Sequence, residues 1–314
     1  MRDGILIINK PQEWTSHDCV AVARRATGVK RAGHGGTLDP MAEGLLPIFI
    51  GKSTRIMEYL DADKKTYRCE ARLGLVTDTQ DIWGRALEER SIEGITEEQV
   101  RTALMSFSGQ TEQLPPKYSA LKVNGRRLYE YARGGLDVDI EPRRIKIYRM
   151  EPEHIEMENG RVIFSVTCSK GTYVRTICHD LGRILGCGGT MSGLVRLRSG
   201  MFDLSKAISP EELKGMKRED IEELLLPVDY PLAGFGAVEM KRDRAGFFVK
   251  GNSIRWNQLK EKKKPDSDGD FKTGRGIPYA DLYRVYSESG EFLGTGFKDR
   301  EKNILKADKV LAAL

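Results

Sequence analysis

The hydrophobic positions of the first 50 residues predict two buried strands with one amphipathic helix between them. Residues 4–8 and 45–50 are short, continuous apolar runs of the length typical of buried strands. The helix begins at Thr15 or Ser16, either of which can cap its first backbone N–H groups, and it ends at Gly28. A glycine-rich loop then leads into the second strand.

The same criteria predict a mixture of strands and helices as far as residue 226. At 67–73, Tyr67, Cys69 and Ala71 fall on one side of a strand of alternating polarity. The other predicted elements are a short helix at 53–60, a helix at 96–108 opened by the capping box of Thr96 and Gln99, a strand at 162–168, a helix with the apolar stripe Val174, Ile177, Leu181 and Ile184 or Leu185, and a helical region at 209–226. Strict βαβ alternation is absent, which favours an α+β domain.

The pattern of hydrophobic and polar residues changes after residues 231–236. Short strand-like pieces follow at 246–249, 282–286 and 291–297, separated by glycines and interrupted by a polar insert at 260–276. We therefore predict two domains, one at 1–232 and a small all-β domain at 236–314.

The distribution of charge is more informative than its total. The chain of 314 residues has a formal net charge of +5, and 39% of its residues are hydrophobic, which suffices for a folded core. Residues 117–149 hold nine Lys and Arg against four acidic residues, and residues 241–264 hold nine against two. The first segment overlaps residues 114–142, which combine proline and glycine turns with a short helical stretch around Leu128 to Ala132 and form a basic excursion from the core. Such separated basic surface suits a polyanionic partner such as nucleic acid.

Several classes of protein lack support in the sequence. No apolar stretch reaches the roughly 18 residues of a membrane span, and residues 5–8 are too few for the apolar core of a signal peptide. Five scattered cysteines predict free thiols and a cytoplasmic location, and without paired spacing they predict no metal site. Gly51-Lys52-Ser53 is not a phosphate loop, because Leu46 stands where that motif requires glycine.

One loop combines groups that can carry chemistry. Gly33-His34-Gly35-Gly36-Thr37-Leu38-Asp39-Pro40 holds three glycines, which let the backbone approach a ligand closely, and Pro40 disfavours helix at Asp39. The loop therefore presents one carboxylate on an irregular, partly rigid segment. Taken alone, the same pattern also fits a turn in which Asp39 satisfies nearby backbone amides.

The whole string around Asp39 is similar to the signature of the TruB family of RNA pseudouridine synthases. The resemblance continues in the same order over roughly residues 5–200. Its other motifs are Asn9-Lys10-Pro11, Thr15-Ser16-His17, Gly44-Leu45-Leu46-Pro47, Lys65-Thr66-Tyr67, Gly74-x-x-Thr77-Asp78-Thr79-x-Asp81, Pro115-Pro116-x-Tyr118-Ser119-Ala120, Gly125-Arg126-Arg127-Leu128-Tyr129-Glu130-Tyr131-Ala132-Arg133 and Cys168-Ser169-Lys170-Gly171-Thr172-Tyr173-Val174-Arg175-Thr176. In the C-terminal part, Val249-Lys250-Gly251-Asn252 and Phe292-Leu293-Gly294-x-Gly296 resemble a PUA domain, a small RNA-binding β-barrel.

The resemblance implies a fold and a reaction. The fold is the α+β pseudouridine synthase fold, with a central mixed, largely antiparallel sheet and flanking helices, followed by a small all-β PUA-like barrel. The reaction isomerises uridine 55 in the T loop of transfer RNA to pseudouridine, after the base has been flipped out of the loop. The N1–C1′ bond breaks and C5 bonds to C1′, so no cofactor is needed. The expected partner is the T stem-loop of tRNA, with no membrane, no obligatory protein partner and a monomeric state.

The resemblance also assigns roles to residues of this sequence. The catalytic residues are Asp39 as nucleophile, Arg175 as the partner that keeps it ionised, and Tyr67, which stacks on the uracil. Attack of Asp39 on the base and attack on the sugar stay open as alternatives. The implied substrate-binding residues are His34, Tyr67, Tyr173, Leu194 and Lys10, and the implied contacts to the RNA backbone are Lys117, Lys122, Arg126, Arg127, Arg133 and Arg143.

Two other functions fit parts of the same pattern. A dyskerin-type enzyme shares the catalytic motifs but works inside a guide-RNA particle, and the long segment at 114–142 favours the stand-alone form instead. A non-catalytic RNA-binding or tRNA-folding protein needs only the basic surface and the PUA-like domain. The presence of Asp39 favours an enzyme.

Overall fold

The two apolar runs near the N-terminus form neighbouring strands, as their pattern predicts. The structure, a computed structural model, describes the whole chain except residues 1, 63, 120, 267–271, 274 and 313–314. β1 (Gly4–Lys10) pairs antiparallel with β3 (Glu43–Ile50), with Leu6 opposite Ile48. Nearly every side chain in both strands is buried, because these strands are covered on both faces.

These strands belong to a central sheet that also contains β2 (Ala32–His34), β4 (Lys65–Leu73), β11 (Ile147–Glu156), β12 (Arg161–Cys168), β13 (Gly189–Ser199) and β14 (Phe202–Asp203). The strand order is β1-β3-β13-β4-β12-β11, with β2 paired to β3 and β14 to β13. Only β13 and β3 run parallel, and the other pairs are antiparallel. The predicted mixed, largely antiparallel sheet is confirmed.

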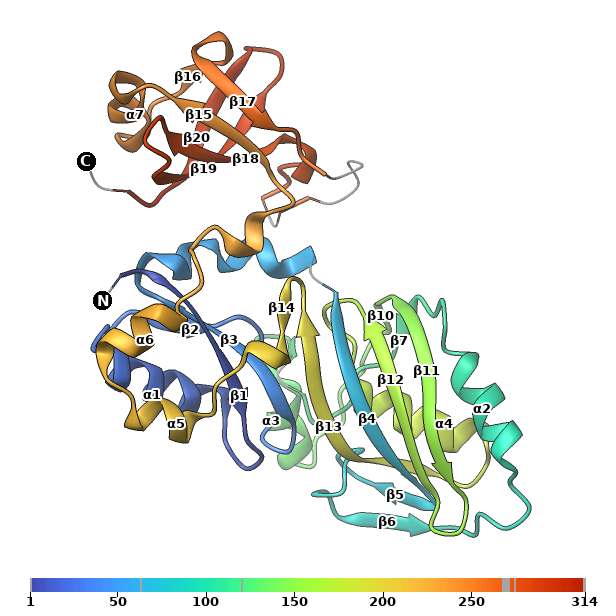
Figure 1. Ribbon diagram of the computed structural model, residues 1–314. Coiled ribbons are helices and arrows are strands. Elements are labelled where there is room, and N and C mark those ends of the chain that lie inside the picture. Colours follow the sequence, from blue (N-terminus) through green and yellow to red (C-terminus); the bar gives the residue numbers. More distant parts are fainter. Residues whose placement is uncertain (1, 63, 120, 267–271, 274, 313–314) are drawn as a thin grey trace.

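Helices cover this sheet unequally (Figure 1). Their bounds are α1 (Ser16–Thr27), η1 (Gly51–Ala62), α2 (Glu97–Met105), α4 (Val174–Ile184), η2 (Leu204–Lys206), α5 (Pro210–Gly215), α6 (Arg218–Leu224) and η3 (Tyr230–Leu232). Around β1 and β3, the helices α1, α5 and α6 pack on one face and the 3-10 helix η1 packs on the other. In the second half of the sheet, α2 and α4 pack on one face only.

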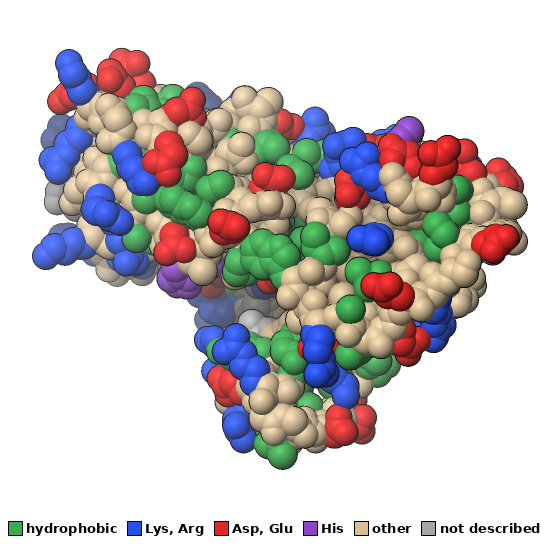
Figure 2. Space-filling view, turned by 90° about the horizontal axis from the view of Figure 1, so that it is seen from below, with side chains coloured by type: hydrophobic (Ala, Val, Ile, Leu, Met, Phe, Trp, Pro, Cys, Tyr) green, Lys and Arg blue, Asp and Glu red, His purple; other side chains and the backbone are tan. Residues whose placement is uncertain are grey.

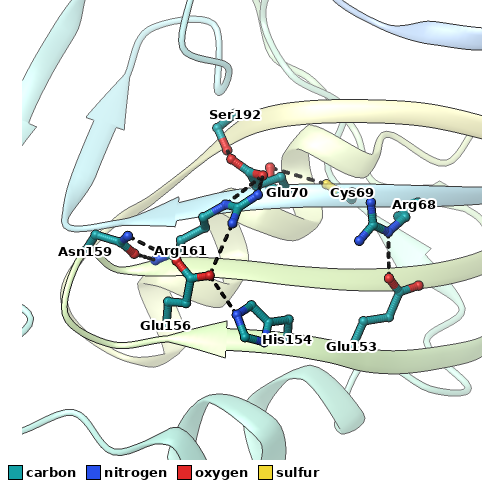
Figure 3. A network of polar contacts seen from close by, with 9 residues as sticks. All are labelled: Arg68, Cys69, Glu70, Glu153, His154, Glu156, Asn159, Arg161 and Ser192. Atoms are coloured by element: carbon teal, nitrogen blue, oxygen red, sulfur yellow. Dashed lines mark hydrogen bonds and ion pairs between the residues drawn. The ribbon is translucent and has the colours of Figure 1, made fainter.

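The open face of that second half is polar. On it, Glu70 and Ser192 lie beside Arg161, which also contacts Glu156, while Arg68 pairs with Glu153 (Figure 3). The Arg161 guanidinium lowers the pKa of the Glu70 carboxyl. Inward-facing residues alternate with these charges along β4, so the period of two in the sequence separates core from solvent.

The ends of α1 follow from its sequence. The hydroxyl of Thr15 accepts the backbone N–H of Asp18, and the Asp18 carboxylate accepts the backbone N–H of Thr15. Gly28 ends the helix at φ +70°, a conformation that favours glycine. Ser16, the alternative cap, instead turns inward and hydrogen-bonds Leu38.

Four predicted elements need correction. The helical region at 209–226 is two short helices, because Met216 and Lys217 adopt extended backbone after Gly215. Residues 246–249 are not a strand but the end of the helix α7 (Arg242–Val249), in which Ala245 and Phe248 are buried at helical spacing. The short helix predicted at 53–60 is part of the longer 3-10 helix η1, and Ile184 is exposed, so Leu185 completes the stripe of α4.

Three small two-stranded sheets extend from the central one. They consist of β5 (Leu75–Thr77) with β6 (Ala86–Glu89), β7 (Glu112–Gln113) with β10 (Arg143–Arg144), and β8 (Lys122–Val123) with β9 (Arg126–Arg127). The last pair leads into α3 (Leu128–Arg133). The helical stretch predicted around residues 128–132 is confirmed as α3, whereas the short strands beside it in residues 114–142, hereafter the insertion, were not predicted.

The C-terminal part forms a separate curled sheet with the order β16-β20-β19-β18-β15-β17 (Figure 1). Its elements, besides α7, are β15 (Gly236–Met240), β16 (Ile254–Arg255), η4 (Trp256–Gln258), β17 (Leu259–Lys263), η5 (Tyr279–Asp281), β18 (Leu282–Ser287), β19 (Phe292–Asp299) and β20 (Ile304–Val310). The arrangement is consistent with a PUA-like domain. We propose domains at 1–232 and 236–314 on this basis. Within the polar insert at 260–276, residues 267–271 and 274 lie outside the described part of the chain.

The two sheets are joined through η1. The Tyr59 hydroxyl hydrogen-bonds both Thr295, at 2.7 Å, and the carboxylate of Asp308. The Tyr59 ring also packs edge-on against Phe235, which packs in turn against Tyr279. No helix in the described residues is long and apolar enough to cross a membrane.

We expect Tyr59→Phe to lower the free energy of unfolding by about 1–3 kcal/mol, because it leaves Thr295 and Asp308 without a buried hydroxyl partner. Urea denaturation followed by circular dichroism measures this change. Tyr148→Phe is the matched control, since no hydrogen bond between the Tyr148 hydroxyl and a described residue is seen and its ring lies near Lys64. Equal stability of the two variants would contradict a structural role for the Tyr59 hydroxyl.

Candidate active site

A cleft of about 690 Å³ opens where the central sheet meets the insertion. Its walls come from the loop at residues 33–40, hereafter the Asp39 loop, from β4 and β13, from the turn after β5, from the insertion and from the start of α4. Figure 2, seen from below, shows a hollow between the main body and a smaller lobe that carries Lys and Arg side chains. In Figure 1, α3 of the insertion lies behind β13, at the position of this lobe.

The Asp39 loop is held by two buried cations. Arg196 donates to the backbone carbonyls of Leu45, Gly36 and Thr37 at 2.7, 3.1 and 3.4 Å. Lys10 Nζ donates to the carbonyls of Pro11, Trp14 and Pro40, and burial lowers the pKa of its ammonium group. Both side chains are fully buried, so their charges are satisfied by backbone dipoles instead of water.

Glycine is required at particular points of this loop. Gly36 has a φ of +107°, which strains residues with a side chain. Gly35 lies so close to the core that an added Cβ would be 2.8 Å from the Phe49 ring. The loop can therefore pass tightly over β3 and leave the Asp39 side chain 48% exposed to the cleft.

Arg175 lies between two carboxylates. Its guanidinium is 3.5 Å from Asp39 Oδ2 and 3.4 Å from Asp81 Oδ2, and it donates to the Tyr118 carbonyl at 2.7 Å. The Arg175 and Asp81 side chains are both largely buried, so these two charges interact with little screening by water, whereas Asp39 is half exposed. The expected partnership of Arg175 with Asp39 is therefore seen as an ion pair.

The position of Arg175 follows from the start of α4. The side-chain amide of Gln113 accepts the backbone N–H of Tyr173 and donates to its carbonyl, at 2.8 and 3.0 Å. This places Tyr173 just before the helix and Arg175 in its first turn, off the apolar stripe. The Arg175 guanidinium also lies over the Tyr173 ring, 5.8 Å from its centre.

Tyr67 and Leu194 form an apolar wall of the cleft. They extend from neighbouring strands, β4 and β13, and both are largely buried. Tyr67 is the cross-strand partner of Arg196, which hydrogen-bonds its hydroxyl. Burial raises the pKa of the Tyr67 phenol, which is therefore protonated at neutral pH.

Two predicted binding residues, Lys10 and His34, are not among the described residues that line the cleft. Lys10 supports the Asp39 loop from beneath. His34 is half-buried at the end of β2, and its ring packs edge-on against His17 with ring centres 5.2 Å apart. Burial, followed by the charges of His17 and Arg196, lowers the pKa of His34 and favours a neutral imidazole.

The residues predicted to contact the RNA backbone are all exposed to solvent. They are Lys117, Lys122, Arg126, Arg127, Arg133 and Arg143. Arg133 lines the cleft itself, and its guanidinium lies over the ring of Tyr129. Lys117 pairs with Asp137 at 2.8 Å. Ala120, which belongs to one of the insertion's motifs, lies outside the described residues.

Sequence reasoning missed the roles of Asp81 and Arg196. Asp81 belongs to the family motif at residues 74–81. Nothing in the sequence indicated that it faces Arg175, which is 94 residues away. A weak indication for Arg196 was present in the sequence. Arg196 is two residues from Leu194, so in a strand both side chains lie on the same face. The strand itself, β13, was not predicted because glycine, serine and arginine interrupt its apolar residues.

Comparison with family models and known proteins places this site in context. Residues 24–174 match the model of the TruB family pseudouridylate synthase N-terminal domain, and residues 175–233 match that of the tRNA pseudouridylate synthase B C-terminal domain. The chain is 42% identical to tRNA pseudouridine synthase B of Alkaliphilus oremlandii, over 99% of this chain and 98% of that protein. It is 40% identical to the protein of the same name from Clostridium kluyveri, over 97% and 99%.

Solved structures show the same fold at lower identity. A chain of an H/ACA RNP bound to a substrate RNA containing 2′-deoxyuridine superposes with a TM-score of 0.70 at 22% identity, over 99% of this chain and 85% of that one. The archaeal box H/ACA sRNP Nop10-Cbf5 complex gives a TM-score of 0.68 at 23% identity, over 98% and 85%. The expected pseudouridine synthase fold is confirmed by this likeness.

We expect Asp81→Asn to lower the free energy of unfolding by about 1–3 kcal/mol, because the buried Arg175 guanidinium then keeps only one anionic partner. The measurement is urea denaturation at neutral pH. Asp78→Asn is the matched control in the same turn, since the Asp78 carboxylate accepts a backbone N–H and, among the described residues, contacts no guanidinium. Equal losses in the two variants would argue against the ion pair as the cause.

Proposed function

This chain belongs to the TruB family of pseudouridine synthases, and on that basis we propose that it isomerises uridine 55 in the T loop of transfer RNA to pseudouridine. The observation that carries the proposal is the ion pair of Asp39 and Arg175 at the wall of the cleft. A half-exposed carboxylate can reach a substrate, and the buried guanidinium next to it holds the carboxylate in position. The volume of the cleft, about 690 Å³, is sufficient for a nucleoside.

In the proposed reaction Asp39 is the nucleophile. Its carboxylate adds either to the uracil ring or to C1′ of the ribose, as the N1–C1′ bond breaks. The uracil then turns within the cleft, C5 bonds to C1′, and the proton from C5 is lost as N1 gains one. The carboxylate leaves unchanged, so the atoms balance without a co-substrate.

The walls of the cleft suit a base that has left its stack. The Tyr67 ring and the Leu194 side chain provide an apolar surface on which an extruded uracil can pack. Because the raised pKa keeps the Tyr67 hydroxyl protonated, Tyr67 is proposed to bind the base with its ring and to donate a proton or hydrogen bond at its edge. Tyr173 lines the same space from the start of α4. His34, in the Asp39 loop at the end of β2, is proposed to take the place of the extruded base.

The insertion is proposed to hold the RNA backbone. Its predicted contacts are exposed cations, several of which lie over tyrosine rings, as Arg126 does over Tyr131 and Arg127 over Tyr129. These guanidinium groups are exposed to solvent, where phosphate groups can bind them. Recognition of a folded T loop by shape and by extruded bases fits this arrangement.

We expect Asp39→Asn to reduce pseudouridine formation in a T-stem-loop RNA by at least about three orders of magnitude, because the amide is not a nucleophile. Pseudouridine is measured in single-turnover reactions with the purified protein alone. Glu97→Gln is the matched control, since it also replaces an ion-paired carboxylate, but on the surface of α2.

The same assay separates the alternatives. Turnover by Asp39→Asn at the rate of the unaltered protein would overturn the assignment of the nucleophile. If the unaltered protein needs a guide RNA, the guide-dependent form of the enzyme is correct. If it binds the RNA without forming pseudouridine under any condition, a non-catalytic RNA-binding function is correct.

We expect replacement of both Arg126 and Arg127 by Gln to weaken RNA binding and to reduce the slope of log K against log salt concentration by about 1–2, because phosphate contacts release counterions. Binding of a T-stem-loop RNA is measured between low and physiological salt. Arg90→Gln is the control, since Arg90 pairs with Glu88 on β6 and is not among the residues that line the cleft. An unchanged slope would exclude these arginines as phosphate contacts.

A further inference from the structure

An exposed indole stands at the rim of the cleft. Trp83 lines the cleft and is 52% exposed, although exposure of so large an apolar surface to water is unfavourable. It lies in the turn between β5 and β6, next to Ile82, which is also exposed. None of the roles proposed above uses Trp83.

The turn holds Trp83 in a defined position. Asp81 Oδ1 accepts the backbone N–H of Trp83 at 3.1 Å and the Thr79 hydroxyl at 2.9 Å. The backbone N–H of Ile82 donates to the Met191 carbonyl of β13 at 3.0 Å, which ties the turn to the central sheet. These contacts fix the backbone that carries the indole, so less conformational freedom is lost when a ligand stacks on it.

The same turn is connected to the proposed catalytic residues. Asp81 uses Oδ1 to hold Trp83, and its other oxygen, Oδ2, lies 3.4 Å from Arg175. A ligand that packs on Trp83 therefore lies beside the group that faces Asp39. Trp83 is suited to bind the part of the substrate next to the reacting nucleotide.

The charge of the cleft indicates the class of ligand. Its basic lining residues are Lys65, Arg133, Lys170, Arg175 and Arg196, and its acidic ones are Asp39 and Asp81. This excess of positive charge favours a polyanion over an apolar peptide. Aromatic side chains in basic grooves bind single-stranded nucleic acid by stacking on the faces of its bases.

We propose that Trp83 forms a second base-binding subsite, on which a nucleobase adjacent to the target uridine stacks when the T loop enters the cleft. This inference rests on the proposed function, because it assumes an RNA loop as substrate. The subsite contributes to binding and to the position of the loop, and Asp39, Arg175 and Tyr67 act on the target nucleotide.

The test measures RNA affinity in an Asp39→Asn background, so that the RNA stays unmodified. The probes are a T-stem-loop RNA and a series in which each loop nucleotide next to the target is replaced, one at a time, by an abasic residue. We expect Trp83→Ala to weaken binding of the intact RNA by about 5- to 100-fold, as for the loss of one stacked base, and Trp83→Phe to restore most of it. Leu87→Ala is the matched control, since Leu87 is equally exposed in the same hairpin but does not line the cleft.

The abasic series identifies the stacked base. At one position, removal of the base should weaken binding about as much as Trp83→Ala does, and the two changes together should cost little more than either alone. Binding should also quench part of the tryptophan fluorescence, and Trp83→Phe should remove that part.

Two results would overturn the inference while leaving the proposed function in place. One is unchanged RNA affinity in Trp83→Ala, which would favour a protein partner at this rim. The other is an equal effect of Trp83→Ala on the intact RNA and on every abasic RNA. Failure of the Asp39→Asn protein to bind the intact T-stem-loop would instead remove the proposed function, and the subsite with it.

Discussion

The structure of the site depends on one buried guanidinium. Arg196 extends from β13 at the seam where that strand runs parallel to β3, and it donates to carbonyls of β3 and of the Asp39 loop. It also hydrogen-bonds Tyr67 across the strand pair. A charge buried this deeply is tolerated only where backbone dipoles surround it, so the loop, the seam and the strand that carries Tyr67 must keep their relative positions. Gly44 makes this approach possible, because a Cβ there would lie 2.6 Å from the Arg196 carbonyl oxygen.

A second buried guanidinium, that of Arg175, also contacts the Asp39 loop. Arg175 joins Asp39 to Asp81, and thereby joins the Asp39 loop to the turn after β5. The formal charge of these three side chains together is −1, and of the two carboxylates Asp39 is half exposed to the cleft whereas Asp81 is largely buried. Because Asp81 also binds the backbone of Trp83, the same ion pairs organise the rim of the cleft. Proposed catalysis and proposed RNA binding thus rest on one connected set of contacts.

The rest of the chain is proposed to bring RNA to this point. The insertion extends exposed cations from one side of the cleft, and it is attached to the body by the Gln113 contacts at the start of α4 and by the Tyr118 carbonyl on Arg175. The C-terminal sheet is fixed to the catalytic half through Tyr59 and the aromatic rings around it. The exposed half of the central sheet, by contrast, carries pairs of opposite charge that satisfy one another and leave little net charge for a polyanion (Figure 3).

Elements with local signals could be predicted from the amino-acid pattern alone. The strand at 4–8, the capping box and Gly28 of α1, the alternation around Tyr67 and the stripe of α4 follow from spacing and caps, and the motifs around Asp39, Tyr67 and Arg175 identified the family. Contacts between side chains that are far apart in the chain became visible in the three-dimensional fold. Asp81 faces Arg175, Arg196 reaches the carbonyls of Gly36 and Thr37, and Trp83 stands at the rim because strand pairing brings together segments that lie far apart in the chain. Periodicity shows which face a side chain takes, but it carries no information on what lies opposite that face.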